Sequence, residues 1–352
     1  MKKSILATAI ASTLVFAAGA EAMSLKISGQ VSKMIVAPDD ASGDEVQFQD
    51  IGWSGSRFRF TGDGDIGNGM KAGFRLEEQL QSNASGGNNG GLETDVSAED
   101  GDDSRDNRYQ DIWVSGSFGK VTMGKGDGAS NGVTEDDLSG TALSSSSNHQ
   151  DNWGGYTLRA GTSWSSIFNM ADGLSRQNRL RYDTPNFSGF SFAASTGQGG
   201  HSEIAARFRG DVSGAKVEAS IGYADQHNLG ASENQVTGGS VSVLLAGGFN
   251  VTVAHSITEP QKPVGATFDQ EATTIKLGYK KGIHAFAVDY GDGTTETALG
   301  DNDADTWGLT WSVVPAKGVE FFATYRELDG DLASNASTDS IDIFAIGSRV
   351  RF

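Results

Sequence analysis

Apolar and polar side chains alternate strictly in many short segments of this chain. In 216–223, Val, Ala, Ile and Tyr occupy the odd positions, and Lys, Glu, Ser and Gly occupy the even ones. Segments 274–279 and 306–313 repeat the pattern, with Ile, Leu, Trp and Val on one parity and mainly Thr, Lys, Ser and Gly on the other. Successive side chains of a β-strand point to opposite faces, so this period predicts strands with one apolar face and one strongly polar face.

About sixteen such segments follow one another, and the connections between them alternate between tight and long. Tight turns are predicted near 65–68, 116–119, 185–187, 211–214, 246–247, 280–282 and 315–318, and long loops at 37–54, 81–106, 127–175, 291–303 and 329–338. Short turns on one rim and long loops on the other are typical of bacterial outer-membrane barrels. A soluble sandwich has no reason to sort its loops in this way. The predicted strands are 25–36, 55–66, 69–80, 107–117, 119–126, 176–185, 188–198, 202–211, 215–224, 236–245, 248–258, 271–280, 282–290, 304–314, 318–328 and 339–352.

The composition narrows the fold class further. The 352-residue chain has 48 Gly and no Cys, so disulfides cannot stabilise it. Beyond the N-terminal region, no run of about 18 apolar residues predicts a transmembrane helix. A sheet that crosses a bilayer must close on itself to pair all its backbone groups, and both ends of the expected mature chain read as strands. We therefore predict an all-β protein, a 16-stranded antiparallel transmembrane β-barrel.

The N-terminus predicts export. Lys2 and Lys3 precede an apolar stretch at 5–19, and Ala20-Glu21-Ala22 forms a small-residue cleavage site. This order is that of a secretory signal peptide. We expect residues 1–22 to be removed, which leaves 23–352 as a single barrel domain. The formal charge of −18 argues against nucleic acid as a partner.

Several motifs resemble the general porin family of Gram-negative bacteria, especially its alphaproteobacterial type. They are Ser56–Phe60, Asp65–Phe74, Gly116–Gly124, Asn178–Tyr182 with Pro185, and the terminal Arg349–Phe352. None is decisive alone, but their order and spacing cover nearly the whole mature chain. The resemblance implies sixteen strands, a homotrimer in the outer membrane, and passive diffusion of small hydrophilic solutes through a water-filled channel.

The resemblance also implies roles for particular segments. The family's long third loop folds into the lumen and narrows it, which here designates 127–175 as the pore-constricting loop. The C-terminal Phe352 resembles the assembly signal read by the outer-membrane insertion machinery, and lipid and lipopolysaccharide are the expected surroundings. The Pro-Glu-Phe-Gly-Gly sequence that some members carry in this loop is missing, and 133–140 stands in its place. The identity of the residues at the narrowest point is therefore open.

Two sets of charged residues are candidates for the pore lining. The acidic set lies in the long loop, and the basic set occupies the polar parity of four strands. If the two sets face each other, they create an electric field across the lumen. In the alternative reading, the acids are solvated and the arginines pair with carboxylates such as Glu77 or Glu218. The acidic set is Glu135, Asp136 and Asp137, and the basic set is Arg57, Arg59, Arg75, Arg179, Arg181, Arg207 and Arg209.

Such charges would make a filter of modest strength. A unit charge about 10 Å from an ion in water contributes roughly 0.4 kcal/mol, which changes permeation by a small factor. The Debye length near physiological salt, about 8 Å, is comparable to a pore radius. Selectivity should therefore weaken as salt rises. The net acidity suggests a mild cation preference that the arginines would oppose.

Other motifs carry little functional information. The Gly-rich stretch Gly62–Gly69 fits a hairpin turn better than a phosphate loop, since no helix or Walker lysine follows it. Acidic stretches at Asp301–Asp305 and Asp95–Asp103 offer oxygen ligands for Ca²⁺, but they lack the EF-hand glycine and glutamate and read better as solvated loops. The five His are dispersed, so no metal site or other cofactor is expected.

Three functions remain open from the sequence. The first is a general diffusion porin. The second is a substrate-selective channel of the same fold, whose ion conductance would be blocked by its solute even at low solute concentration. The third is a different class, an outer-membrane enzyme or a secreted β-rich adhesin. An enzyme is not expected, because the chain has no Cys nucleophile. An adhesin would remain soluble instead of fractionating with the outer membrane.

Overall fold

A computed structural model describes residues 23–39, 46–83, 105–158, 161–227, 233–262, 269–334 and 338–352. The predicted signal peptide at 1–22 lies outside these residues. The chain forms one sheet of antiparallel strands, with one short helix, α2 (His149–Trp153), and one 3-10 turn, η1 (Trp164–Ser166). The strands are β1 (Lys26–Asp39), β2 (Gln47–Asp50), β3 (Arg57–Gly67), β4 (Met70–Leu80), β5 (Arg105–Gly116), β6 (Gly119–Asp127), β7 (Arg176–Asp183), β8 (Phe190–Gly197), β9 (Ser202–Val212), β10 (Ala215–Gln226), β11 (Glu233–Leu244), β12 (Phe249–Lys262), β13 (Gln270–Lys281), β14 (His284–Thr297), β15 (Gly300–Ala316), β16 (Val319–Asp331) and β17 (Ile341–Arg351).

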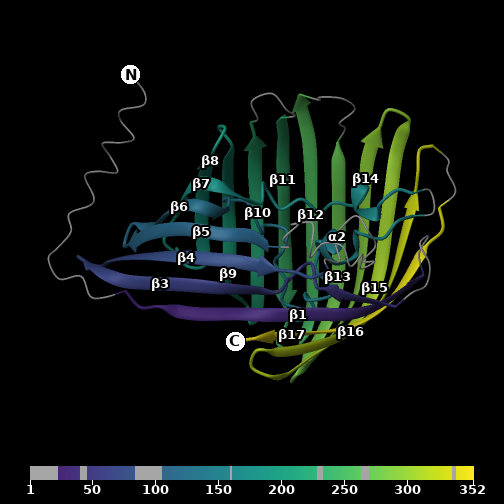
Figure 1. Ribbon diagram of the computed structural model, residues 1–352, viewed down its shortest axis with the longest axis horizontal. Helices are drawn as coiled ribbons and strands as arrows, with labels where there is room; N and C mark the ends of the chain where they lie inside the picture. The colour runs from purple at the N-terminus through teal and green to yellow at the C-terminus, as the bar shows by residue number, and fades with distance from the viewer. Residues whose placement is uncertain are drawn as a thin grey trace.

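The sheet closes into a barrel because its first and last strands pair. β1 lies antiparallel to β17, from Gln30 opposite Arg351 to Asp39 opposite Asp342. Every other neighbouring pair from β3 to β17 is also antiparallel and consecutive in sequence. Figure 1 shows the strands curving around an interior that the chain between β6 and β7 crosses. The predicted closed antiparallel barrel is confirmed.

Seventeen strands fill sixteen positions in this barrel. One edge of β1 pairs with β17, and its other edge is shared by β2 and β3. β2 pairs with 33–36 of β1, and β3 pairs with 26–30. β2 and β3 are therefore two parts of one barrel strand, interrupted at 51–56, which agrees with the predicted count of sixteen.

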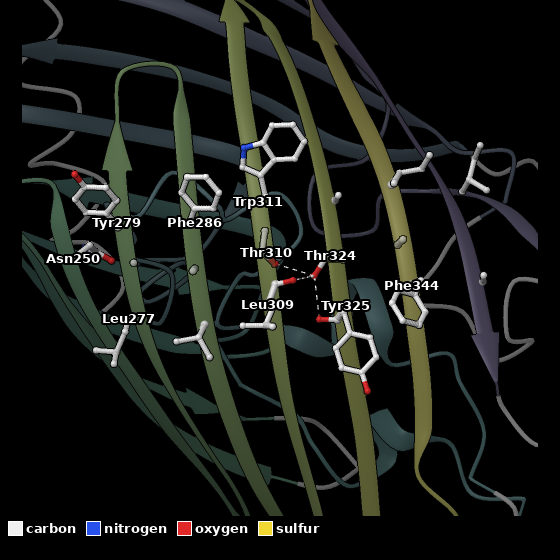
Figure 2. A pocket seen from close by; sticks show the side chains of 18 of the residues that line it. Asn250, Leu277, Tyr279, Phe286, Leu309, Thr310, Trp311, Thr324, Tyr325 and Phe344 are labelled. Atoms are coloured by element: carbon white, nitrogen blue, oxygen red, sulfur yellow. Dashed lines mark hydrogen bonds between the residues drawn. The ribbon is translucent and has the colours of Figure 1, made fainter.

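The barrel is apolar on its outside and polar on its inside. In β14, Phe286 and Val288 are 49% and 42% exposed, whereas Ala287 and Asp289, which alternate with them, are buried. The same alternation runs through the strands, so large apolar side chains face outward. Figure 2 shows Leu277, Tyr279, Phe286, Trp311 and Tyr325 on one outer surface that spans β13 to β16. A bilayer requires this arrangement of a barrel, with apolar residues toward lipid and polar ones toward the lumen.

One predicted loop proves to be strand. The connection expected at 291–303 is occupied by the ends of β14 and β15, which pair up to Thr297 opposite Gly300. The acidic stretch Asp301–Asp305, read as a solvated loop, is therefore part of β15. Its Asp and Asn residues suggested a loop because a strand that extends beyond the membrane carries polar residues on both faces. Within the described residues, no helix is long and apolar enough to cross a bilayer.

Candidate functional site

The chain between β6 and β7 lies along the inner face of the barrel; we call residues 128–175, apart from 159–160, the inner segment. Its backbone is attached to inward-facing hydroxyl groups of the wall. The amides of Asp136 and Leu138 donate to Ser240 Oγ and Ser242 Oγ of β11, at 3.0 and 2.9 Å. Ala171 donates in the same way to a serine of β12. Because the inward residues of these strands are small and polar, the segment approaches the wall closely.

The inner segment also has an apolar core. Trp153, Trp164 and Phe168 are fully buried, and the last two rings stack with centroids 4.7 Å apart. They belong to an apolar cluster that includes inward residues of β1, β12, β13 and β15 to β17, such as Met34 and Phe322. This cluster fills one side of the barrel interior, so the open space lies on the side of β3 to β7.

That space is a cavity of about 870 Å³ with two sides of opposite charge. Its basic residues come from the barrel strands β3, β5 and β7, and three of its acidic residues come from the inner segment. A fourth acid, Asp127 of β6, is paired with Arg176. We call these sets the basic face and the acidic face. The basic face is Arg57, Arg108 and Arg176, and the acidic face is Glu135, Asp151 and Asp172.

All seven arginines predicted to line the lumen lie on the inward parity of their strands. Arg57 and Arg59 both contact the buried Glu77. Arg108, which was not among the predicted arginines, also contacts Glu77, at 2.8 Å. Three guanidinium groups therefore surround one carboxylate. The alternative prediction of an arginine–Glu77 pair agrees with this geometry, yet an excess of positive charge remains.

The other predicted arginines also have partners on the inner face of the barrel. Asp111 Oδ2 accepts hydrogen bonds from Arg75 Nη2 at 2.8 Å and from Arg179 Nη2 at 3.0 Å. Arg181 pairs with Asp183 at 2.7 Å. Arg207 donates to two carbonyl oxygens of the inner segment.

The three predicted loop acids do not act together. Asp136 is buried against the wall and pairs with Arg209 at 2.5 Å. Asp137 pairs with Lys276 of β13, also at 2.5 Å. Of the three, Glu135 alone lines the charged cavity. The expectation that Glu135, Asp136 and Asp137 share one face of the pore thus differs from the structure, because the wall cations Arg209 and Lys276 pair with Asp136 and Asp137.

Asp151 and Asp172 take the places expected for Asp136 and Asp137. The carboxyl groups of Glu135 and Asp172 are hydrogen-bonded to each other, and Asn131 Nδ2 donates to Asp172 Oδ2 at 3.1 Å. Burial raises the pKa of Glu135 well above its usual value, and the neighbouring Asp172 adds to the effect. Burial, followed by repulsion from Asp172, raises the pKa of Asp151 to about 7. No periodicity in the loop sequence could have identified these two residues.

Tyr109 of β5 organises part of the basic face. Its ring lies under the guanidinium of Arg75, 3.5 Å from the centroid, and within 5.5 Å of the guanidinium of Arg176. Its hydroxyl group donates to Asp127 Oδ2 at 2.5 Å. Because Arg176 Nε also lies 3.3 Å from Asp127 Oδ1, the tyrosine and the carboxylate together fix the position of Arg176.

A second charged cluster joins the inner segment to the opposite wall. Asp289 of β14 accepts hydrogen bonds from Arg326 Nη2 of β16 and from Ser145 Oγ of the segment, both at 2.6 Å. His149 Nε2 of α2 lies 3.5 Å from Asp289 Oδ1. All three titratable side chains are fully buried. Arg326 and Asp289 occupy inward positions in the alternation of their strands. The sequence pattern therefore could have identified them, although they were not among the predicted site residues.

Of the two acidic stretches considered as possible Ca²⁺ ligands, Asp301–Asp305 lies within the described residues. Across the described ranges, no group of three or more His, Cys, Asp or Glu is placed to hold a metal ion. Asp301–Asp305 lies in β15, where alternate residues point to opposite faces. The other stretch, Asp95–Asp103, lies outside the described residues.

Comparisons with known proteins agree with this architecture. A family model described as Gram-negative porin matches residues 7–345. An anion-selective porin from Comamonas acidovorans has 18% sequence identity and a TM-score of 0.65, and the alignment covers 94% of this chain and 100% of the other. OmpF of Salmonella typhi, in complex with daunomycin, has 14% identity and a TM-score of 0.64 over 93% and 97% of the two chains. The trimer form of OmpT from Vibrio cholerae has 18% identity and a TM-score of 0.60 over 94% and 100%. No curated protein matches the sequence.

Proposed function

Because this chain belongs to the Gram-negative porin family and forms an outer-membrane channel for passive diffusion, we propose that solutes pass between its acidic and basic faces. The cavity between them is then the narrow part of the channel, and the inner segment is the element that narrows it. The observation that supports this proposal is the placement of Glu135, Asp151 and Asp172 opposite Arg57, Arg108 and Arg176 around one cavity.

The two faces would select among solutes by size and, mildly, by charge. One unit charge about 10 Å from an ion contributes roughly 0.4 kcal/mol in water, or about a twofold change in permeability. Three carboxylates on one side together contribute about 1.2 kcal/mol, which favours a cation roughly eightfold without screening and less as salt screens the charges. The positive charges across the cavity oppose this effect, so small solutes of either charge would pass, as expected of a general diffusion porin.

Oligomer and partners belong to the same proposal. We expect a homotrimer, which the trimer form of the similar Vibrio cholerae protein supports. The apolar outer surface would contact lipid and lipopolysaccharide. The terminal Phe352 would be read by the outer-membrane assembly machinery. We expect no enzymatic activity, and the family assignment gives no support to a secreted adhesin.

Reversal potentials across a planar bilayer test the charged cavity. At pH 8, the combined variant Glu135→Gln, Asp151→Asn and Asp172→Asn should shift the reversal potential in a salt gradient toward anion selectivity. A matched control neutralises three exposed outward acids, Glu271→Gln, Asp301→Asn and Asp331→Asn. An equal reversal potential in the wild type and the cavity variant would reject the assignment of the acidic face.

A further inference from the structure

His149 occupies an unusual position between the inner segment and the barrel wall. It is fully buried, and its Nε2 lies 3.5 Å from Asp289 Oδ1. Among the residues that the structure describes, neither of its ring nitrogens has a hydrogen-bond partner. A histidine in this position belongs neither to the acidic face nor to the basic face of the channel.

The charges around His149 are already balanced without it. Asp289 is paired with Arg326 at 2.6 Å, and Lys276 of β13 is paired with Asp137 of the inner segment at 2.5 Å. These two acids and two bases are the charged groups that the adjoining strands and the segment bring to this interface. The acid on its own helix, Asp151, lines the charged cavity. A proton on His149 would therefore add an uncompensated charge.

The site also leaves little room for water beside the ring. The Phe168 ring lies with its centroid 5.6 Å from that of His149. On β14, a Cβ atom added to Gly291 would lie 2.9 Å from His149 Cδ2. Burial, and then repulsion from Arg326, lowers the pKa of His149 well below its usual value, although Asp289 opposes the shift. When the segment leaves the wall, His149 is hydrated and regains an ordinary pKa of about 6.5.

We propose that His149, Asp289 and Arg326 form an acid-sensitive latch, in which proton uptake by His149 releases the inner segment from the barrel wall. The latch deepens the proposed function and rests on it, since the segment is taken to narrow the channel. Asp289 and Arg326 are positioning residues: Asp289 holds Ser145 of the segment at 2.6 Å, and Arg326 fixes Asp289.

Proton linkage gives the direction in which pH shifts the equilibrium between the docked and the released segment. The docked segment disfavours the proton on His149, so the released segment binds more protons at low pH. Above about pH 6.5 His149 is neutral in both states and has no effect. Below this pH its contribution raises the released-to-docked ratio by up to about tenfold per pH unit, until the lowered pKa of the docked state is reached.

Other groups titrate in the opposite sense. Burial raises the pKa values of Glu135, Asp151 and Asp172 in the docked segment, so their protonation favours docking as pH falls. The pH dependence of the wild type alone therefore combines two effects. Comparison with a variant that lacks only the imidazole isolates the contribution of His149.

Thiol labelling measures release directly, because the chain contains no Cys. Ser144 of the inner segment is fully buried, and its hydroxyl group has no hydrogen-bond partner among the described residues, so Ser144→Cys is a mild reporter. The labelling rate is measured from pH 7.5 to 4.5 on purified protein, with and without His149→Gln. Lys281→Cys, at the exposed end of β13, corrects at each pH for the falling reactivity of the thiol.

The decisive quantity is the corrected labelling rate of the His149 protein divided by that of the His149→Gln variant. This ratio should rise by up to about tenfold per pH unit below pH 6.5 and then level off. A ratio that stays constant with pH overturns the latch. His149→Phe replaces His149→Gln if the latter does not fold. Reversal potentials at pH 8 test the charged cavity separately, since His149 is neutral there in both states.

Discussion

The backbone amide of Phe352 donates to the carbonyl oxygen of Gly29, and the amide of Gly29 donates to the carbonyl oxygen of Phe352, both at 3.0 Å. The last residue of the chain is thereby paired with the first strand, and the Phe352 ring lies outward over Gly29. A barrel in a bilayer has no other way to satisfy these edge groups. Closure thus depends on the small size of residue 29.

Gly29→Val should impair closure of the barrel. An added Cβ would lie 2.5 Å from the Phe352 ring and 2.7 Å from the backbone oxygen of Arg57, and a backbone oxygen cannot move aside easily. Overpacking of this kind costs about 1–3 kcal/mol. The folded fraction after refolding in detergent, read from heat-dependent gel mobility, should fall. Gly247→Ala is the matched control, since an added Cβ there would lie 4.0 Å from the Phe249 ring. Equal folding of Gly29→Val and the wild type would contradict the close contact.

Because Asp289 and Arg326 form a buried pair, the stability of the protein should depend strongly on keeping Arg326 beside Asp289. Arg326→Met leaves Asp289 buried without its cation, and breaking such a pair costs about 3–5 kcal/mol. The double variant Arg326→Met, Asp289→Leu removes both charges and should recover most of that loss. Denaturant unfolding in detergent measures both values. A single variant as stable as the double one would show that Asp289 does not depend on Arg326.

Asp151 predicts a change of ion selectivity near neutral pH. Burial and the neighbouring Asp172 raise its pKa to about 7, so between pH 6 and 8 the acidic face gains negative charge. The reversal potential should move toward cation selectivity over this interval, and Asp151→Asn should remove the transition. The same raised pKa favours the docked inner segment at low pH, an effect lost as pH rises from the ordinary value of 3.8 through about 7. An unchanged transition in Asp151→Asn would assign it to another group.

Neutralising the basic face should have the opposite effect on selectivity. Arg57→Gln with Arg108→Gln removes two cations from the cavity and leaves Glu77 with Arg59 alone. The permeability ratio should shift toward cations by up to about fifteenfold in dilute salt, since each charge acts about twofold on cations and about twofold in the opposite sense on anions, and by less in concentrated salt. Arg351→Gln, at the exposed end of β17, serves as the control for altered net charge. A shift of similar size in the control would exclude a local effect.

Much of the barrel could be predicted because strand parity is a property of neighbouring residues. The alternation placed Arg57, Arg179 and Arg207 correctly on the inward side, and it would have placed Lys276 and Arg326 there too. The inner segment has no such period, so its contacts depend on which wall groups it meets. Asp136 and Asp137 therefore turned out to be paired with wall cations, while Asp151 and Asp172 line the cavity. The ends of β14 and β15 beyond the apolar outer surface have polar residues on both faces. They therefore lack the alternation that identifies a strand, and the sequence predicted these two strands too short.

Planar-bilayer conductance of the purified protein tests most directly whether the polar interior is an aqueous passage through an apolar-surfaced barrel. The structure predicts stepwise current increases that are proportional to voltage and that rise with salt concentration. Under a salt gradient, the reversal potential should approach zero as both salt concentrations are raised. A bilayer that stays non-conducting, together with protein that stays dispersed without detergent, would contradict this arrangement of the two faces.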